Sequence, residues 1–245
     1  MTKKFEFTSA GLHILAMVLM LLDHMWATVM TGSEWMTCVG RIAFPIFAFM
    51  VAEGYTHTRD VKKYMKRMLL WAVITELPFN LMTGGWFNPL HQNVLWTFLI
   101  ALYGLSLIEK AEKNGRNAKF WLVTAAVVAV SWLVGTVTFV DYSGFGVLTV
   151  YVFYFFRRRD IIGFLGQLFF LWLINFELLG GLVYPFTLFG REFWFPQQGL
   201  ALLALIPIWL YRGRQGYKEK WFKTFCYAFY PAHMLVLWAV AVLTQ

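Results

Sequence analysis

Residues 12–30 of this chain read LHILAMVLMLLDHMWATVM, an apolar run that is interrupted near its end by the adjacent residues Asp23 and His24. A run of this length suits one helix across the hydrocarbon core of a bilayer, which needs about 20 residues. An ionisable side chain inside such a helix costs roughly 2.5–3.5 kcal/mol on insertion scales, so it usually has a partner or a task. The stretch therefore predicts a membrane-spanning first helix and marks Asp23 and His24 as candidate functional residues.

The whole chain has the composition of a membrane protein, since 60% of its 245 residues are hydrophobic and 14% are charged. Soluble domains carry about 25% charged residues. Apolar stretches of spanning length recur from end to end, whereas the alternating segments of a transmembrane β-barrel are absent. We therefore expect one all-α domain over residues 1–245, a polytopic membrane helical bundle with about nine transmembrane helices and a range of about eight to ten.

The predicted helices cover residues 10–30, 37–57, 66–83, 93–109, 119–139, 144–157, 161–179, 196–211 and 222–243. Residues 179–200 do not fit a clean span, because glycines, prolines and the pair Arg191-Glu192 interrupt them. We expect either an outer loop or a re-entrant segment there. Cys38 and Cys226 fall near opposite faces in this topology, so no disulfide between them is expected.

The basic residues are distributed asymmetrically. All but two of the 21 Lys and Arg residues fall in loops on one side of the predicted topology, the exceptions being Arg41 and Arg191. The positive-inside rule places these loops and the N-terminus in the cytoplasm and the C-terminus outside. Topology thus explains the net charge of +8, and nucleic acid is not expected as a partner.

Helix geometry suggests different roles for Asp23 and His24. Neighbouring residues point about 100° apart on a helix, so the two side chains cannot share one partner. Arg41 lies in the next, antiparallel helix, and the depths of Asp23 and Arg41 below the outer boundary are about 10 Å and about 7 Å at 1.5 Å per residue. An Asp23–Arg41 ion pair is therefore expected, which leaves His24 to face a cavity; all three could instead hold helices together.

A second polar group lies at the predicted cytoplasmic end of the second helix. Glu53 and His57 are four residues apart and share a helix face. A basic cluster follows, formed by Arg59, Lys62, Lys63, Lys66 and Arg67. It can anchor the protein at the inner leaflet, or it can bind the phosphates of an anionic cytosolic cofactor together with His57.

Further candidates lie deeper in the predicted helices. Glu76 lies in the third helix with Pro78 and Asn80 beyond it, and Tyr230 and His233 flank Pro231 in the last helix. A mid-membrane Glu needs a basic partner or water, and Pro opens the local hydrogen-bond ladder. By predicted depth, His24 and His57 are too far apart to hold one ion, so no metal site is expected.

Several segments together resemble the TraX family of membrane acetyltransferases, named for a conjugative-plasmid protein that acetylates the N-terminus of pilin. The resemblance rests on ILAMVLMLLDH (14–24), GRIAFPIFAF (40–49), EGYTHTRD (53–60), KYMKR (63–67), LYRGRQG (210–216) and FYPAHML (229–235), in family order. The family looks like a compact branch of the transmembrane acyltransferases, which similarly carry a His near the end of the first helix, a basic cluster after the second and a His in the last.

The resemblance implies acetyl transfer from cytosolic acetyl-CoA to an amine or hydroxyl acceptor, such as a pilin N-terminus or an envelope glycan, in a bacterial plasma membrane. His24 matches the superfamily's catalytic histidine by position. His suits the general base of acyl transfer near neutral pH, while Asp23 or Arg41 could set the electrostatics, and Arg41, Asn80 or a backbone amide could stabilise the oxyanion. The acceptor and the oligomeric state stay open, and a homo-oligomer is compatible with the sequence.

Two other functions compete with this one. A proton-coupled transporter could use Asp23, His24, Glu53 and Glu76 as a relay, although no second half of the chain repeats these residues. A noncatalytic assembly subunit could use the same buried charges to pair helices.

Overall fold

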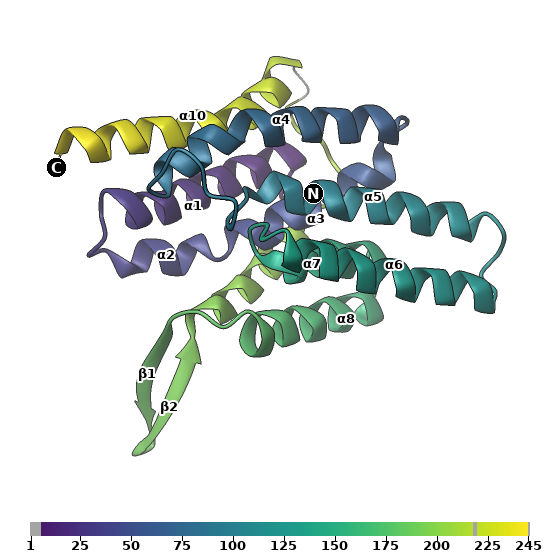
Figure 1. Cartoon of the computed structure of the whole chain (residues 1–245). Helices are drawn as coiled ribbons and strands as arrows, with labels where there is room; N and C mark the ends of the chain where they lie inside the picture. The colour runs from purple at the N-terminus through teal and green to yellow at the C-terminus, as the bar shows by residue number, and fades with distance from the viewer. Residues whose placement is uncertain (1–5, 218–219, 245) are drawn as a thin grey trace, which may run out of the picture. The chain divides into compact units, whose positions relative to one another are not determined.

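The computed structural model describes residues 6–217 and 220–244, which form a mostly helical protein (Figure 1). The predicted basic residues Lys3, Lys4 and Lys218 lie outside these ranges. The chain divides into two compact units. Unit 1 comprises residues 1–47 and 164–245, and unit 2 comprises residues 48–163.

The helices and strands follow one another along the chain in this order: α1 (Ser9–Thr28), α2 (Glu34–Gly40), α3 (Ala43–His57), α4 (Val61–Met82), α5 (Val94–Glu112), α6 (Ala118–Val137), α7 (Ser143–Phe155), α8 (Ile161–Trp172), a π-helical segment (Leu173–Leu178), β1 (Val183–Leu188), β2 (Arg191–Pro196), a 3₁₀ helix (Gln197–Ala204), α9 (Leu205–Leu210) and α10 (Lys220–Thr244).

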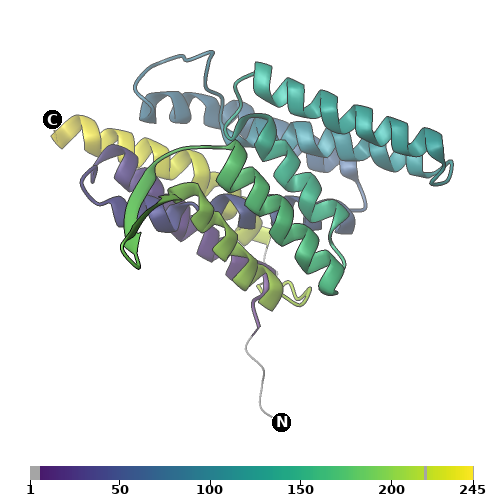
Figure 2. The same ribbon diagram turned by 90° about the horizontal axis from the view of Figure 1, so that it is seen from below.

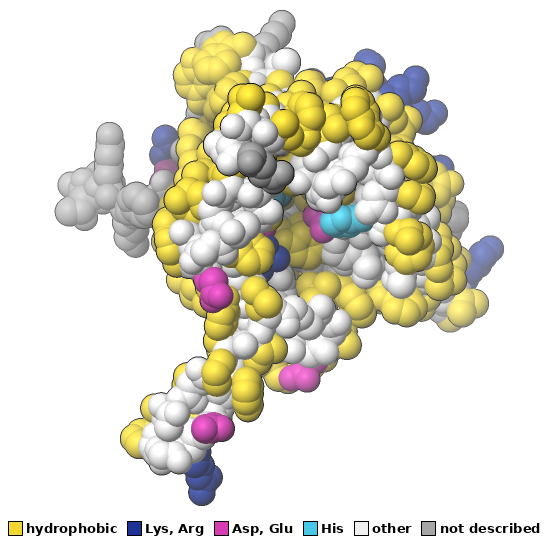
Figure 3. All heavy atoms as spheres, turned by 60° about the vertical axis from the view of Figure 1, so that its left-hand side comes forward, with side chains coloured by type: hydrophobic (Ala, Val, Ile, Leu, Met, Phe, Trp, Pro, Cys, Tyr) yellow, Lys and Arg dark blue, Asp and Glu magenta, His cyan; other side chains and the backbone are white. Residues whose placement is uncertain are grey.

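Six of the described helical segments are long and apolar enough to cross a membrane: Ser9–Thr28, Glu34–His57, Val94–Glu112, Ala118–Val137, Ile161–Leu178 and Trp221–Thr244. Helix α4 has 22 residues, but its first turns are basic. Many large apolar side chains on these helices are exposed, and hydrophobic side chains cover much of the face in Figure 3. An apolar surface of this extent fits contact with lipid, and the protein is a helical membrane protein.

In unit 1, α1 packs against both α2 and α10. The start of α1 is held by the segment that precedes α10, because the N–H groups of Ser9 and Ala10 donate to the carbonyls of Arg214 (2.9 Å) and Gln215 (3.1 Å). These N–H groups belong to the first turn of a helix and have no partner inside it. The contact fixes α1 relative to the segment 210–216.

In unit 2, α5 packs against α4, α6 and α7, and α5 and α6 lie side by side in both views (Figures 1 and 2). The close approach depends on Gly104, where an added Cβ would lie 1.9 Å from the hydroxyl of Tyr151. That hydroxyl donates to Ser131 Oγ at 2.9 Å. A small residue on α5 thus makes room for a polar contact between α7 and α6.

Four helices differ from their predicted form, one of them the predicted helix 161–179, which continues beyond Trp172 as the π-helical segment. The predicted helix 37–57 is divided into α2 and α3 at Arg41 and Ile42, because Pro45 cannot donate to the carbonyl four residues earlier and its ring crowds it. The predicted helix 66–83 begins earlier, at Val61, where the Asp60 side chain caps it. The predicted helix 196–211 begins as a 3₁₀ helix.

Residues 179–200 contain a β-hairpin, which the sequence analysis missed. Strands β1 and β2 pair antiparallel from Val183 with Pro196 to Leu188 with Arg191. The two turn residues, Phe189 (φ 52°) and Gly190 (φ 75°), both have left-handed backbone, as a type I′ hairpin turn requires. Glycine signals at 180, 181 and 190 indicate turns, but they do not show whether the residues between them pair.

Candidate functional site

The predicted histidines of the first and last helices meet in unit 1. His24 Nδ1 on α1 lies 2.7 Å from His233 Nε2 on α10. The ring planes are 8° apart and the centroids 4.9 Å apart. Because the ring planes are nearly parallel, a nitrogen–nitrogen distance of 2.7 Å at this centroid separation requires both nitrogens to lie on the line between the centroids. The rings therefore lie edge to edge and share an in-plane hydrogen bond.

The proton positions in this pair follow from the third partner. His233 Nδ1 lies 2.7 Å from the carbonyl oxygen of Phe229. A carbonyl only accepts, so Nδ1 of His233 carries the proton, and in the neutral ring its Nε2 is an acceptor. His24 Nδ1 must then donate to His233 Nε2. We assign these tautomers from the hydrogen-bond network, and they leave His24 Nε2 with a lone pair.

Aromatic side chains of α10 surround the pair. The Phe229 ring is stacked on His233, with centroids 4.9 Å apart, and the Tyr230 ring lies 6.5 Å from His24 and 5.9 Å from His233. His233 and Tyr230 are buried, and His24 is partly buried. On the opposite side of α1, about 200° around the helix from His24, the indole Nε1 of Trp26 is buried and has no hydrogen-bond partner among the described residues. A buried donor of this kind marks a place for water or a polar ligand group.

The predicted Asp23–Arg41 ion pair is present in unit 1. One guanidinium nitrogen of Arg41 donates to both carboxylate oxygens of Asp23. Arg41 also donates from Nε to the Thr37 carbonyl (3.2 Å) and from Nη2 to the Thr37 hydroxyl (3.3 Å). Both charged side chains are about four-fifths buried, with exposed fractions of 20% and 17%. The adjacent residues of α1 thus have different partners: Asp23 contacts Arg41, directly after α2, and His24 contacts His233 on α10.

Gly40 allows this pair to form. A Cβ on residue 40 would lie 2.4 Å from the Cβ of Asp23 and 2.7 Å from its Oδ1. Only glycine therefore permits α2 to approach Asp23 this closely. Thr37 and Gly40 belong to the site but were not predicted; a glycine next to a membrane-embedded Arg is the signal that could have indicated them.

Glu76 and Asn80 belong to a different polar cluster, within unit 2. The Glu76 carboxylate accepts hydrogen bonds from Asn93 Nδ2 (2.5 Å), Trp96 Nε1 (2.9 Å) and Asn80 Nδ2 (3.2 Å). Asn80 Oδ1 accepts from the Asn88 N–H at 2.7 Å, so the cluster joins α4, the following loop and α5. Three donors on one carboxylate fit a structural role. Asn93 and Trp96 were missed, because both resemble ordinary cap and belt residues in sequence.

The basic cluster of residues 59–67 lies at the start of α4 in unit 2. The side chains of His57, Arg59, Lys62, Lys63, Lys66 and Arg67 are all exposed. The four on α4 have i,i+4 spacing in two rows, and the helix N-terminus beneath them carries partial positive charge. Asp60 caps it by accepting from the Lys63 N–H at 2.9 Å, a bond that holds the pKa of this carboxyl below its usual value. The surface suits phosphate.

Glu53 and His57 form a weaker contact at the end of α3. His57 Nδ1 lies 2.9 Å from the Glu53 carbonyl and 3.8 Å from its carboxylate. The imidazole is exposed to solvent, so it is available to a ligand at the surface.

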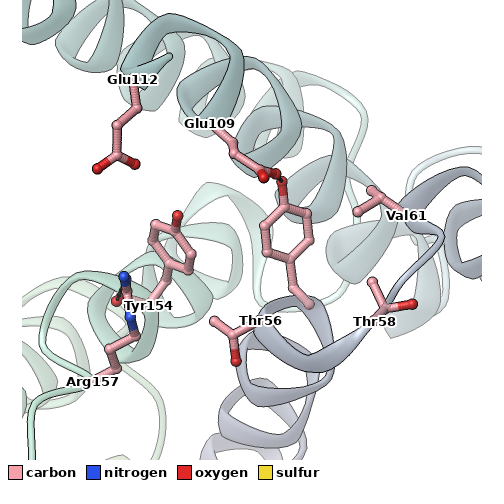
Figure 4. A pocket seen from close by; sticks show the side chains of 8 residues that line it. Thr56, Thr58, Val61, Glu109, Glu112, Tyr154 and Arg157 are labelled. Carbon is pink, nitrogen blue, oxygen red and sulfur yellow. Dashed lines mark hydrogen bonds between the residues drawn. The ribbon is translucent and has the colours of Figure 1, made fainter. Parts of the chain in front are cut away.

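A cavity of about 450 Å³ lies within unit 2, among the ends of α3, α5 and α7 (Figure 4). Its walls include Tyr55, whose hydroxyl donates to Glu109, and Tyr154, whose ring lies 4.7 Å from the Arg157 guanidinium. Glu112 also lines it. Two carboxylates in its wall make the cavity a poor fit for phosphates, and none of the residues predicted as functional lines it.

No group of three or more His, Cys, Asp or Glu side chains among the described residues could hold an ion. Cys38 and Cys226 are both free thiols, as expected.

Comparisons with known proteins place the chain in a family. The family model described as TraX protein matches residues 8–241. The chain is 28% identical over 145 residues to the "Probable fimbrial assembly protein FimC, serogroup H1" of Dichelobacter nodosus, covering 51% of this chain and 55% of that protein. It is 27% identical over 146 residues to "Protein TraX" of Escherichia coli, covering 59% of this chain and 54% of that protein. The chain spans about half the length of the curated relatives it matches. No solved structure matches it.

Proposed function

This chain belongs to the TraX family, and on that premise we propose that it is an integral membrane acyltransferase that moves an acetyl group from acetyl-CoA to an amine or hydroxyl acceptor. The observation that carries the proposal is the His24–His233 hydrogen bond. Its tautomers leave His24 Nε2 as a positioned base in a partly buried place, and a base near neutral pH is what acyl transfer needs.

The proposed reaction has one proton to move. The acceptor amine or hydroxyl attacks the thioester carbonyl, and its new bond to the acetyl carbon replaces the carbon–sulfur bond. His24 Nε2 takes the acceptor's proton, and that proton returns to the departing CoA thiolate. His233 accepts the Nδ1–H of His24 and so stabilises the imidazolium that forms in between. The Asp23–Arg41 ion pair holds α1 against the end of α2. Because its two charges cancel, it adds no net charge beside His24.

The exposed basic cluster supports a docking role toward the donor's phosphates. Arg and Lys side chains bind phosphate through charge-assisted hydrogen bonds, and the start of α4 offers them on a helix N-terminus. We propose that His57, Arg59, Lys62, Lys63, Lys66 and Arg67 supply this surface.

The names of two relatives support a proposal for the acceptor and the cellular setting. One relative is named as a probable fimbrial assembly protein and another as TraX. We propose that this protein acts in the assembly of a bacterial surface appendage, with a pilin N-terminus or an envelope glycan as acceptor. It would lie in the plasma membrane with the N-terminus and the basic loops in the cytoplasm, and cross the membrane about nine times.

A noncatalytic assembly role is the second candidate. It is favoured by the complete pairing of Asp23 with Arg41 and of Glu76 with three donors, since paired charges can serve helix packing alone. The same pairing weakens the proton-relay hypothesis, because a relay carboxylate must change partners.

The deciding experiment replaces His24 by Ala in the full chain purified in detergent. Release of free CoA from acetyl-CoA should fall to the background rate, while the thermal unfolding midpoint stays near that of the wild type. His13→Ala is the matched control, because His13 lies on the same helix and its one hydrogen bond among the described residues is to the Ser9 carbonyl of its own turn (2.8 Å), with a ring contact to Phe222 of α10. Unchanged turnover in His24→Ala, or no CoA binding by calorimetry at millimolar ligand, would exclude the acyltransferase.

The docking surface has its own test. Charge reversal of Lys62, Lys63 and Arg67 should raise the KM for acetyl-CoA more than it lowers kcat. Reversal of Lys110, Lys113 and Arg116, three exposed basic residues at the end of α5 and in the loop after it, should leave KM unchanged. Equal effects of the two variants would show that net charge acts rather than docking.

A further inference from the structure

The β1–β2 hairpin of unit 1 ends in a residue that folding alone does not explain. Phe189 is 96% exposed, and it has a left-handed backbone with φ 52°. Positive φ is unfavourable for a bulky side chain, and Asn or Gly is the usual choice in this turn. A strained residue persists where it serves something other than local stability, so the tip of the hairpin has a use for an aromatic ring.

The distal half of the hairpin has two different faces. Residues two apart share a face of a strand, so Phe186 and Leu188 lie on the same face as Phe193, the cross-strand partner of Phe186. The rings of Phe186 and Phe193 are stacked 5.5 Å apart, and all three side chains are exposed. The opposite face carries the cross-strand pair Thr187 and Glu192 near the tip and, nearer the base, the pair Pro185 and Trp194, whose side chain is also exposed. The hairpin is therefore amphipathic near its tip, with an unburied apolar face.

At the base of the hairpin the same face packs against other parts of unit 1, which separates the base from the tip. The Phe195 ring contacts Phe176 of the π-helical segment at 5.6 Å, and the Tyr184 hydroxyl lies 3.9 Å from Cys38 Sγ. The unburied face follows directly on a candidate span, Ile161–Leu178, whose exposed side chains include Phe169 and Leu178. An apolar surface suited to lipid thus continues from the end of that span onto the hairpin.

The direction of the hairpin limits what can cover this face. It runs across the direction of α1 and α10 rather than along them (Figure 1). If those helices cross the bilayer, the hairpin runs along its surface. Two strands leave unpaired N–H and C=O groups on both outer edges, and such groups are not tolerated in the hydrocarbon core. Only the headgroup zone offers both water for the edges and acyl chains for the rings.

We propose that the β1–β2 hairpin is an interfacial membrane anchor. Phe186, Leu188, Phe189 and Phe193 face the acyl chains, and Thr187 and Glu192 face water. Arg191 is the cross-strand partner of Leu188 and lies at the tip end of the apolar face. There its guanidinium can reach lipid phosphates while the aliphatic part of its side chain stays among the rings. The partner is the lipid bilayer interface, and the anchor operates whether or not the protein is an acyltransferase.

The test is a set of single spin labels in a Cys38→Ser/Cys226→Ser background, in vesicles of phosphatidylethanolamine and phosphatidylglycerol. Labels replace Phe186, Thr187, Glu192 and Phe193 one at a time. The ratio of collisions with oxygen to collisions with a water-soluble nickel complex should be several-fold higher at 186 and 193 than at 187 and 192. A label at Val236, exposed on α10, and one at Asn114, in the α5–α6 loop, give the lipid and water limits.

Two outcomes would overturn the proposal. Nickel accessibility at all four positions would mean that the hairpin stands in water, free for a protein partner. Low accessibility to both reagents would mean that the apolar face is covered by protein, such as a second copy of the chain. Thermal unfolding of each labelled variant in detergent checks that the hairpin base is intact.

Discussion

At the scale of single residues, the proposed chemistry depends on which nitrogen carries a proton. The chain of hydrogen bonds runs from His24, which donates, through His233 to the Phe229 carbonyl, which accepts. The direction of each bond fixes the direction of the next. His233 contributes by holding the ring of His24 and its tautomer, and we regard it as a positioning residue. If His233 is a positioning residue, substitution by Ala and substitution by Gln should have different effects on the rate. If its role is purely steric, the two substitutions should have similar effects.

We predict that His233→Ala lowers kcat strongly. The loss should not exceed the contribution of a general base to the rate, which is about 10²–10⁴-fold. His233→Gln should recover part of the loss, because its side-chain oxygen can accept from His24 Nδ1. The measurement is the rate of CoA release across pH, since loss of the fixed tautomer should also change the pH profile. If Ala and Gln are equally impaired with an unchanged profile, His233 only fills space.

Contacts between single residues could be predicted from the sequence where the two residues lie in consecutive helices. Asp23 and Arg41 are 18 positions apart in consecutive helices, so their depths could be compared directly, and their ion pair is confirmed. His24 and His233 are 209 positions apart. Each could be named as a candidate, but no periodicity relates the first helix of a chain to its last.

At the scale of elements, the approach of α2 to α1 depends on Gly40. We predict that Gly40→Ala destabilises the protein, because the added methyl overlaps the Asp23 side chain; overpacking of this kind costs about 1–3 kcal/mol. The thermal unfolding midpoint in detergent should fall. Gly32→Ala in the α1–α2 connection is the control, since a Cβ there meets nothing within 4 Å. Equal midpoints for the two variants would contradict the role of Gly40.

The loops around α5 and α7 are joined by a contact that depends on pH. His91 Nε2 lies 3.9 Å from the Asp141 carboxylate, which raises the pKa of His91 above its usual value. A His with a raised folded pKa adds stability below its unfolded pKa, about 6.5, and loses it as pH rises through the folded pKa. Both side chains are partly exposed, so the contribution should not exceed about 1 kcal/mol.

We therefore predict that His91→Gln lowers the unfolding midpoint at pH 5.5 and that the difference from the wild type disappears by pH 9. Asp141→Asn should show the same pH dependence. A difference that is constant across this range would show that His91 contributes through packing on the Phe79 ring, 4.8 Å away, rather than through charge.

Element boundaries were predictable where a local signal exists and missed where the signal was misjudged. The Asn caps of α5 and α6 and the Ser9 start of α1 agree closely with the apolar runs. The break at Arg41 and Ile42 was missed because hydropathy continues through Pro45. The hairpin was missed because the pairing of its two strands depends on the turn at Phe189 and Gly190. A hydropathy pattern contains no information on that turn.

At the scale of the whole molecule, the number of membrane crossings decides the location of the C-terminus. Six described helices meet the length and apolarity of a span, and an even number would put both termini on one side. The charge distribution predicts an odd number, with the basic loops inside. Helix α4 and the shorter apolar helices Ser143–Phe155 and Gln197–Leu210 would supply the additional crossings.

We predict that a C-terminal alkaline phosphatase fusion is active and a C-terminal green fluorescent protein fusion is dark. A cysteine at position 114, in the basic α5–α6 loop, should resist a membrane-impermeant maleimide in intact cells, whereas one at Trp86 should react. Labelling of both positions, or a fluorescent C-terminal fusion, would contradict the predicted topology.

The sequence by itself determined that this is a helical membrane protein, which residues are costly in lipid, and the family to which it belongs. These properties depend on composition, local periodicity and residue order, all of which are present in one dimension. The tertiary structure decided which costly residues meet: His24 with His233, Glu76 with Asn93 and Trp96, and the strands of the hairpin with each other. Such contacts depend on which helix faces are turned together, and in a membrane protein lipid-facing and protein-facing surfaces are equally apolar, so one sequence does not distinguish them.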